Sequence, residues 1–396
     1  MFFSRPAVAV DPQKIEALLS RCVAEVVPSK ESLRALLQSG KRLRIKLGID
    51  PTSPDIHLGR TVPLLKLKDF QDLGHTVVFI AGDFTALVGD ASDKESERPM
   101  LSEATIRQNM ATYREQVGKI LDLSKTEFRR NSEWLAKLSF KEIAEQANLF
   151  SVADFIAREN VRRRLDAGKR VSLREVLYPI MQGYDSVAIK ADVELGGTDQ
   201  RFNILAGRPL QEHYGQKPQH ALLFTLITSP DGRKMSSSWG NTVNIADSAN
   251  DMFGKIMAVP DDFIESYFMH VTRVPEAAVK RLMDGHPKDA KMALAEEIVR
   301  MYHGADAGKA ARNAFAHTFS EQRAPEEVPE LAFKDTLMET LVTGGVVASN
   351  SEYRRLWEAG AIRYADSGEI LRDSEAVTGR VLRIGKHRFV KIKNRP

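Results

Sequence analysis

The 396-residue sequence has a single cysteine, and this scarcity excludes two kinds of site. Cys22 cannot form a disulfide within the chain, and one thiolate cannot build a cysteine metal cluster. We expect Cys22 to pack inside a helix over residues 15–27. No apolar run approaches the ~18 residues of a membrane-spanning helix. The apolar stretch before Asp11 is too short for a signal peptide, so we expect a cytoplasmic protein without a membrane partner.

The sequence also has little excess charge of one sign, because it contains 57 Lys and Arg and 53 Asp and Glu, for a net charge of +4. This balance does not by itself indicate a nucleic-acid partner. The distribution is more informative, since seven basic residues and no acid follow from Arg380 to the end. Such a tail can neutralise a phosphate backbone, although a solvated end without a partner would have the same charge.

The order of the elements indicates an α/β protein with additional domains. A buried strand over residues 43–49, a helix over 58–73 and a strand over 76–81 form a strand–helix–strand unit, which predicts a parallel sheet. After residue 242 the pattern predicts helices without strands, and a following stretch rich in Glu and Pro indicates a linker. We therefore expect an α/β domain over 1–242, a helical domain over 243–318, a linker over 319–332 and a small α+β domain over 333–396.

The polar segment from Asp50 to Arg60 lies between the first strand and its helix, where doubly wound sheets bind ligands. His57 and Gly59 fall on the first turn of that helix, whose free N–H groups attract anions. A phosphate site is one interpretation. A histidine that only caps the helix is the other.

A second polar segment, Gly232–Ser238, follows the last predicted strand and carries Lys234 with three serines. By itself it fits a polyphosphate site or a solvated loop equally. The two segments in this order resemble the paired HIGH and KMSKS signatures of class I aminoacyl-tRNA synthetases. The resemblance implies a Rossmann-like catalytic domain with His57, Arg60, Lys234 and Ser237 in catalysis. It also implies ATP contacts from Asp50, Thr52, His57, Gly59, Gly197, Asp199, Lys234, Met235, Ser236 and Ser237.

A third segment, Tyr178–Asp185, indicates the amino acid. Tyr178, Gln182 and Asp185 share one face of a helix, which requires either a buried polar network or a ligand. The segment resembles the tyrosine-binding helix of tyrosyl-tRNA synthetases, in which Asp185 would accept from the phenol and reject phenylalanine. The resemblance implies tyrosine contacts from Lys46, Gly48, Asp90, Tyr178, Gln182, Asp185 and Gln200.

The C-terminal segments 341–356 and 381–389 resemble an S4-type RNA-binding domain, which favours the RNA interpretation of the basic tail. Ser349 is expected to cap a helix there. The residues expected to contact RNA are Arg354, Arg355, Arg383, Lys386, Arg388 and Lys391.

Together these resemblances imply a bacterial-type enzyme that makes tyrosyl-adenylate from tyrosine and ATP and then charges tRNA(Tyr). They also imply a homodimer. No His, Asp or Glu cluster has metal-ligand spacing, so we expect Mg²⁺ to arrive with ATP.

Four positions depart from the usual bacterial pattern: Arg60 replaces the second histidine of HIGH, Ser237 a lysine, Lys46 a tyrosine and Arg201 a tryptophan. We hypothesise that Arg60 supplies phosphate-directed charge in place of the lysine; a helix-surface residue is the alternative.

Three other functions stay open from the sequence. A tryptophan-activating relative would share both signatures, but the Tyr178–Asp185 helix and the basic tail argue against it. A non-catalytic RNA-binding paralogue would have little reason to keep the signature residues. A nucleotidyltransferase without tRNA would leave the helical middle and the tail unexplained.

Overall fold

The computed structural model describes residues 7–90, 100–227, 242–320, 328–372, 377–385 and 388–393, with only the backbone of 318–320. The chain forms two compact units, residues 1–304 and 305–396. The division after Gly304 lies inside the predicted helical domain, and the four-part domain division stays a prediction.

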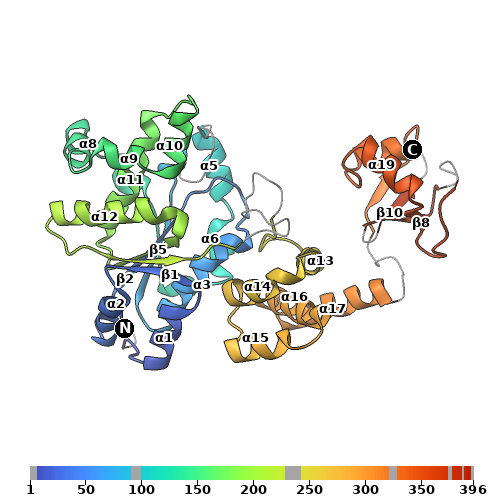
Figure 1. The fold of residues 1–396 in the computed structure, drawn as a ribbon, viewed down its shortest axis with the longest axis horizontal. Coiled ribbons are helices and arrows are strands. Elements are labelled where there is room, and N and C mark those ends of the chain that lie inside the picture. The colour runs from blue at the N-terminus through green and yellow to red at the C-terminus, as the bar shows by residue number, and fades with distance from the viewer. Residues whose placement is uncertain are drawn as a thin grey trace. The chain divides into compact units, whose positions relative to one another are not determined.

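The first unit is built on a six-stranded sheet in the order β1-β6-β5-β2-β3-β4 (Figure 1). Strand β1 runs antiparallel to β6, and the other neighbouring pairs are parallel. The expected parallel sheet is therefore confirmed, with one antiparallel edge strand. The strands are β1 (Val23–Val27), β2 (Arg44–Ile49), β3 (Thr76–Ala81), β4 (Thr126–Arg130), β5 (Val193–Gly197) and β6 (His220–Phe224).

The strand order reverses between β2 and β5. From β2 the chain moves outward through helix α3 (Leu58–Asp72) to β3, whereas from β5 it moves the other way through α12 (Arg201–His213) to β6. Right-handed crossovers in opposite directions place these helices on opposite faces of the sheet, as Figure 1 shows. A crevice must therefore open beyond the carboxyl ends of β2 and β5.

Local signals explain where the helices begin and end. Helix α11 (Leu173–Ile189) starts at a capping box, in which Ser172 accepts the N–H of N3 and Glu175 accepts the N–H of Ser172. Helix α3 ends before Gly74, whose φ of 89° suits glycine. The remaining helices of this part of the chain are α1 (Pro12–Ser20), α2 (Lys30–Gln38), α4 (Thr85–Val88), α5 (Glu103–Met110), α6 (Tyr113–Gly118), α7 (Ser132–Leu135), α8 (Phe140–Ala147), α9 (Val152–Ile156) and α10 (Glu159–Asp166).

The predicted helix over residues 15–27 is wrong in its second half. Helix α1 ends at Ser20, Cys22 has a φ of 57°, and the next five residues form β1. Val23, Val26 and Val27 are β-branched, which suits a strand, and β1 pairs with β6 some 200 residues later. Pairing with β6 therefore outweighs the local helical pattern. Cys22 is a half-buried free thiol in the turn between α1 and β1.

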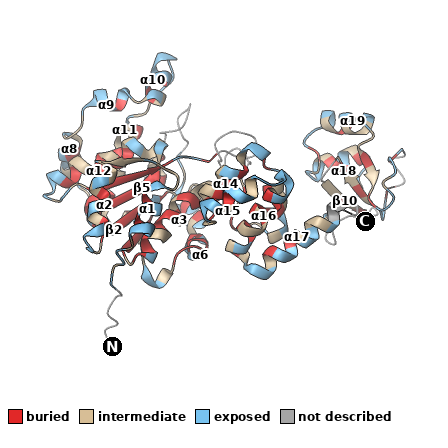
Figure 2. Cartoon of the chain, turned by 60° about the horizontal axis from the view of Figure 1, so that its bottom comes forward, coloured by how far each residue is buried: buried red, intermediate tan, exposed pale blue. Residues whose placement is uncertain are grey.

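Helices without strands follow in residues 242–304, as expected: α13 (Ala249–Met257), α14 (Ile264–Val271), α15 (Glu276–Met283) and α16 (Pro287–His303). Helix α14 packs on α3. Figure 2 shows buried residues running from the sheet into these helices. They belong to the same compact unit as the sheet.

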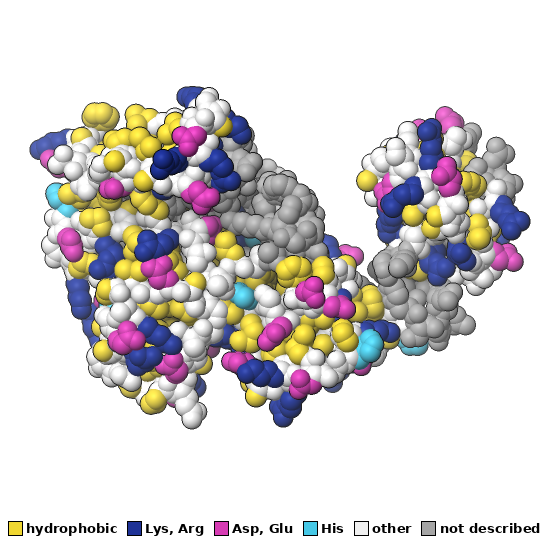
Figure 3. Space-filling view, in the orientation of Figure 1, with side chains coloured by type: hydrophobic (Ala, Val, Ile, Leu, Met, Phe, Trp, Pro, Cys, Tyr) yellow, Lys and Arg dark blue, Asp and Glu magenta, His cyan; other side chains and the backbone are white. Residues whose placement is uncertain are grey.

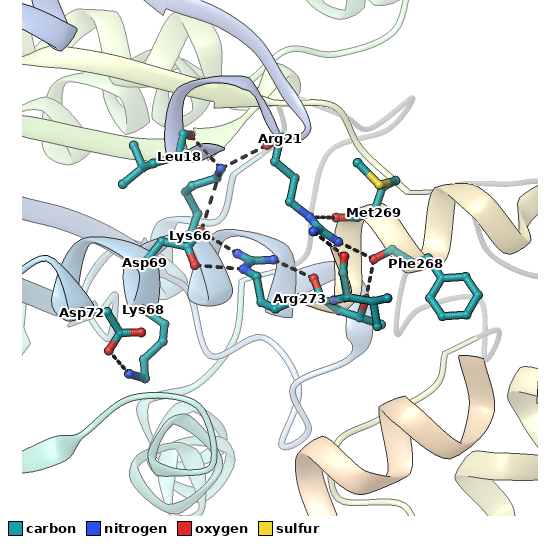
Figure 4. A network of polar contacts seen from close by, with 11 residues as sticks. Leu18, Arg21, Lys66, Lys68, Asp69, Asp72, Phe268, Met269 and Arg273 are labelled. Carbon is teal, nitrogen blue, oxygen red and sulfur yellow. Dashed lines mark hydrogen bonds and ion pairs between the residues drawn. The ribbon is translucent and has the colours of Figure 1, made fainter. Parts of the chain in front are cut away.

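A polar network joins these helices to α1 and α3 (Figure 4). Lys66 on α3 donates to the carbonyls of Leu18 (2.7 Å) and Arg21 (3.0 Å) at the end of α1. Burial lowers the pKa of Lys66 to about 8. Arg273, after α14, makes a bidentate ion pair with Asp69 on α3, with both distances 2.9 Å.

Arg21 makes the most extensive contacts of this network. Its guanidinium donates at 2.8 Å to three carbonyls at and after the end of α14, those of Phe268, Met269 and Val274. It therefore satisfies acceptors that a helix end leaves open.

Replacing Arg21 by methionine should lower the free energy of unfolding of the first unit by about 2 kcal/mol, because three part-buried carbonyls each lose a donor and, among the described residues, only that of Phe268 keeps another, Thr272 Oγ1. Amide hydrogen exchange should accelerate in residues 264–274 and not in α12. An unchanged exchange rate there would contradict this role. Arg34→Met, which removes an exposed pair with Glu16, is the matched control and should cost little.

The second unit contains α17 (Ala305–Ser320), α18 (Leu337–Thr343) and α19 (Asn350–Glu358). A four-stranded sheet has the order β7-β10-β9-β8, and Leu341, Tyr353, Leu382 and Val390 lie in its core. The last three residues of the predicted linker form strand β7, which pairs with β10. The strands are β7 (Glu330–Ala332), β8 (Ile362–Tyr364), β9 (Val381–Ile384) and β10 (Arg388–Lys393).

Candidate active site

A pocket of about 570 Å³ lies at the carboxyl ends of β2 and β5, where the strand order reverses. Its size suits a small-molecule substrate. Most of the described residues that the sequence assigned to catalysis, ATP or tyrosine line it: Gly48, Asp50, Thr52, His57, Gly59, Arg60, Asp90, Tyr178, Gln182, Asp185, Gly197, Asp199 and Gln200. The fold therefore brings described members of both predicted sets together in one cavity.

Asp185 is a buried carboxylate on the pocket wall, with a side chain aimed from α11 towards the ends of β3 and β4. It accepts from Trp134 Nε1 at 2.7 Å and from Asn131 Nδ2 at 3.3 Å. Burial raises its pKa to about 7, although the nearby Lys46 ammonium and these two hydrogen bonds oppose the rise. A carboxylate held this way can accept a hydrogen bond from a ligand hydroxyl.

Tyrosine binding should therefore depend on pH near neutrality. In the empty pocket Asp185 takes up a proton below pH 7, and a ligand whose phenol needs the carboxylate must displace that proton. The dissociation constant for tyrosine should rise about tenfold per pH unit below 7 and level off above it. Equilibrium dialysis at constant ionic strength would measure this. Asp185→Asn is the control, and a wild-type profile as flat as that of the variant would contradict the prediction.

Tyr178 and Asp50 meet across the pocket. The Tyr178 hydroxyl donates to Asp50 Oδ2 at 2.9 Å, while Thr85 Oγ1 donates to Asp50 Oδ1 at 2.7 Å. Since the hydroxyl hydrogen is directed at Asp50, the phenolic oxygen keeps lone pairs that can accept from a ligand ammonium. A Cβ at Gly82 would collide with Asp50 and Thr85, so this arrangement requires glycine there.

The amides of Gln182 and Gln200 are both held by carboxylates. Gln182 Nε2 donates to Glu194 at 3.1 Å, and Gln200 Nε2 donates to Asp90 at 2.8 Å. Asn203 on α12 donates to Gln200 Oε1 at 3.0 Å. Hydrogen bonds to neighbouring polar side chains therefore position Gln182 and Gln200, two of the predicted tyrosine ligands.

On the ATP side, His57 is the N-cap residue of α3, but its side chain makes no capping hydrogen bond. The capping interpretation of His57 is therefore wrong, and the side chain lines the pocket instead. Arg60 also lines the pocket; its guanidinium donates to Tyr113 Oη (2.6 Å) and Thr52 Oγ1 (2.9 Å). It is not a plain helix-surface residue, and its contact with phosphate stays a prediction.

The backbone beyond the second signature is anchored beside His57. Leu58 N–H donates to Val243 O at 2.9 Å, and Ile245 N–H donates to Ile56 O at 3.0 Å. Residues 243–245, which follow the second signature segment in the sequence, therefore lie beside the first signature segment. Lys234, Met235, Ser236 and Ser237 lie outside the described residues, so their predicted roles in ATP binding stay predictions.

Lys46 does not line the pocket, contrary to its predicted contact with tyrosine. Its side chain is fully buried. Its ammonium is bound to Gln182 O (2.7 Å), Ser186 Oγ (2.8 Å) and Glu194 Oε1 (2.9 Å). Three acceptors use all three N–H donors, so Lys46 has no donor left for a phenol.

The structure also adds residues that the sequence did not single out. Glu194, Asn131, Thr85 and Asn109 line the pocket, and Trp134 contacts Asp185. Of these, Glu194 alone carried a usable local signal, as an acidic residue between the apolar Val193 and Leu195. Arg201, which stands where the usual bacterial pattern has a tryptophan, forms an exposed ion pair with Glu25 of β1 at 2.7 Å.

Two of the predicted RNA contacts are exposed and two are engaged within the second unit. Arg354 and Arg355 are exposed on α19, and Ser349 caps that helix as predicted. Arg388 donates to Val346 O and pairs with Glu352 (2.8 Å), and Lys391 pairs with Glu330 (3.0 Å). Arg383 is half-buried in β9, and Lys386 lies outside the described residues.

Within the described ranges, no cluster of three His, Cys, Asp or Glu side chains is arranged to hold a metal ion. In the same part of the chain, no helix has the length and apolarity to span a membrane.

The comparisons with known proteins agree with this geometry. Residues 38–320 match the family model of class I tRNA synthetases for tryptophan and tyrosine. A tyrosine–tRNA ligase of Moorella thermoacetica is 44% identical over 392 residues, covering 95% of this chain and 94% of the relative. One from Thermotoga maritima is 42% identical, covering 96% and 98%. A truncated mitochondrial tyrosyl-tRNA synthetase of Coccidioides posadasii superposes with a TM-score of 0.63 at 26% identity, covering 76% of this chain and 91% of that one.

These relatives favour tyrosine over the tryptophan alternative, and their near-complete coverage includes the helical middle and the C-terminal unit. The chain therefore belongs to the class I tRNA synthetases, in the family of tyrosine–tRNA ligases.

Proposed function

We propose that the pocket at the carboxyl ends of β2 and β5 binds tyrosine and ATP side by side and forms tyrosyl-adenylate. The observation that carries this assignment is the buried Asp185 carboxylate, oriented by Trp134 and Asn131 at one end of the pocket. It accepts the phenolic O–H, while Tyr178, Gln182 and Asp90 at the other side bind the ammonium. Phenylalanine would leave the carboxylate buried without this partner, which costs binding free energy.

The reaction is an in-line displacement. A carboxylate oxygen of tyrosine attacks the α-phosphorus of ATP, a P–O bond forms, and pyrophosphate leaves with the electrons of the broken P–O bond. Catalysis then requires positioning and charge stabilisation rather than a covalent enzyme intermediate. His57 and the N-terminus of α3 lie where they can stabilise phosphate charge, and Arg60 adds a cation. Mg²⁺ is part of the ATP substrate.

In the second step a hydroxyl of the 3′-terminal adenosine of tRNA(Tyr) attacks the adenylate carbonyl and AMP leaves. Arg354 and Arg355 on α19 are exposed cations suited to RNA phosphates. This proposal includes specificity for tRNA(Tyr) and an S4-like RNA-binding role of the C-terminal unit. It also includes a location in the cytoplasm, where ATP and tRNA are found.

The test is pyrophosphate exchange into ATP, without tRNA, with tyrosine, tryptophan and phenylalanine as parallel substrates. Exchange with tyrosine alone supports the Asp185 assignment. Exchange with tryptophan would move the pocket to the sister specificity, and exchange with none of the three would leave an RNA-binding protein without the adenylate step.

We also propose that the chain forms a homodimer through α8–α11. Large hydrophobic side chains are exposed there, with Phe140 at 87%, Leu173 at 75% and Val152 at 65%. Figure 3 shows hydrophobic surface over this part of the first unit. Exposed apolar area of this kind is typical of an interaction surface.

Replacing both Phe140 and Leu173 by glutamate should therefore convert a dimer to a monomer at micromolar concentration, because charge would be buried at the interface. Sedimentation velocity measures the change. Ile370→Glu, on an exposed apolar residue of the second unit, is the control and should leave the mass unchanged. A dimer that persists in the double variant would contradict this interface.

A further inference from the structure

A buried ion pair lies directly beneath the proposed tyrosine site. Lys46 of β2 and Glu194 of β5 are opposite each other in the parallel pairing of these strands. Their side chains are 0% and 1% exposed, and Lys46 Nζ lies 2.9 Å from Glu194 Oε1. Removing two charges from water is costly, and hydrophobic residues of similar size often serve stability equally well. Stability alone is therefore a weak reason for this pair.

The pair contacts one proposed ligand of the amino group twice. Lys46 Nζ donates to the backbone carbonyl of Gln182 at 2.7 Å. Glu194 Oε1 accepts from the side-chain amide of the same residue, Gln182 Nε2, at 3.1 Å. Gln182 and Glu194 both line the pocket, whereas Lys46 lies behind them.

Further hydrogen bonds fix Glu194 in place. Its second oxygen, Oε2, accepts from Ser186 Oγ at 3.0 Å and from Gln219 Nε2 at 2.6 Å. Ser186 Oγ also accepts from Lys46 Nζ at 2.8 Å. The carboxylate is therefore held from α11, from β2 and from the segment before β6, and it cannot turn away from Gln182 without losing these bonds.

The direction of the Gln182 hydrogen bond matters for chemistry. A glutamine amide has donors on its nitrogen and an acceptor on its oxygen. An ammonium group can only donate, so it requires the oxygen. Since Glu194 can only accept when ionised, it takes the Gln182 nitrogen and leaves the oxygen, Oε1, for the ligand side.

We propose that the Lys46–Glu194 pair is a positioning device for the substrate amino group, which fixes the Gln182 amide with its oxygen directed at the ammonium of tyrosine. Lys46 supplies the counter-charge that offsets the cost of burying the Glu194 carboxylate. The inference rests on the proposed assignment of Gln182 to the ammonium. It gives Lys46 and Glu194 a role in amino-group recognition without contact between Lys46 and the substrate.

The role can be separated from a merely structural one because it concerns a single group of the ligand. Tyrosine and 3-(4-hydroxyphenyl)propionate share the phenol and the carboxylate and differ in the ammonium. A variant that only loosens the pocket should weaken both ligands, whereas loss of the Gln182 orientation should weaken tyrosine alone.

The first variant is Lys46→Met/Glu194→Met in the full-length chain, since removing both charges avoids an unpaired buried charge. Calorimetric titration should show about tenfold weaker tyrosine binding and unchanged binding of 3-(4-hydroxyphenyl)propionate. Equal weakening of the two ligands, or no weakening of tyrosine, would overturn the proposal.

A second variant, Lys46→Met/Glu194→Gln, returns an uncharged acceptor to the position opposite Gln182. It should recover most of the lost tyrosine affinity, and a loss as large as in the first variant would also overturn the proposal.

Gln182→Leu is the reference for the site itself and should weaken tyrosine selectively. If it weakens neither ligand, or both equally, the assignment of Gln182 to the ammonium fails, and with it this inference. If it is selective while the Lys46→Met/Glu194→Met variant is not, only the inference about the pair fails.

Discussion

Replacing Asp185 by asparagine should lower kcat/KM for tyrosine in pyrophosphate exchange by about 100-fold, while kcat/KM for phenylalanine changes little. The variant keeps the shape of the side chain but removes the charge. Its new N–H donors would face the phenol and Asn131, which already directs Nδ2 at this position from 3.3 Å. Tyrosine loses a charge-assisted hydrogen bond, whereas phenylalanine never made one.

The quantity to compare is therefore the ratio of the two kcat/KM values. Asp83→Asn is a matched control, because Asp83 accepts from Ser132 N (2.9 Å) and Oγ (2.7 Å) near the same strand ends and does not line the pocket. It should leave the ratio intact. If Asp185→Asn kept the wild-type preference for tyrosine, another group would have to select the phenol.

The second large effect concerns stability. Arg164→Met should lower the free energy of unfolding by about 3–5 kcal/mol, because it leaves a buried carboxylate unpaired. Arg164 forms a bidentate pair with Glu175 at 2.6 and 3.0 Å, and both side chains are buried. Burial would raise the pKa of Glu175, but the hydrogen bonds from Arg164 and from the Ser172 N–H outweigh it and lower the pKa.

Glu175 also belongs to the capping box that starts α11, the helix with Tyr178, Gln182 and Asp185. Tyrosine affinity should therefore fall together with stability. Urea unfolding followed by tryptophan fluorescence measures the first effect. The double variant Arg164→Met/Glu175→Met should recover most of the lost stability, since it buries no charge; a double variant as unstable as the single one would show that the pair does not act through its charge.

Much of the fold could be predicted because its signals are local. The strand expected over residues 43–49 is β2 at Arg44–Ile49, and the helix expected to carry Tyr178–Asp185 is α11 at Leu173–Ile189. Hydrophobic periodicity, Gly74 and the serine caps each act within a few residues. The same holds for the spacing of Tyr178, Gln182 and Asp185, which puts them on one helix face in any fold.

Other features could not be predicted, because their physical cause lies far along the chain. Residues 23–27 form a strand only because β6 lies beside them. Lys46 was expected to meet the substrate, but Glu194, 148 residues later, occupies the opposite position in β5 and binds it. Trp134 and Asn131 orient Asp185 from beyond β4, and no local pattern marks them.

The sequence by itself determined elements such as β2 and α11, the two signature segments and the side chains that share one face of α11, because short-range sterics, capping and periodicity decide these features. Only the tertiary structure decided which groups become partners of those side chains. Burial makes each unpaired charge or donor costly, so the pairing of Lys46 with Glu194, Tyr178 with Asp50 and Asp185 with Trp134 depends on which strands and helices the fold brings together.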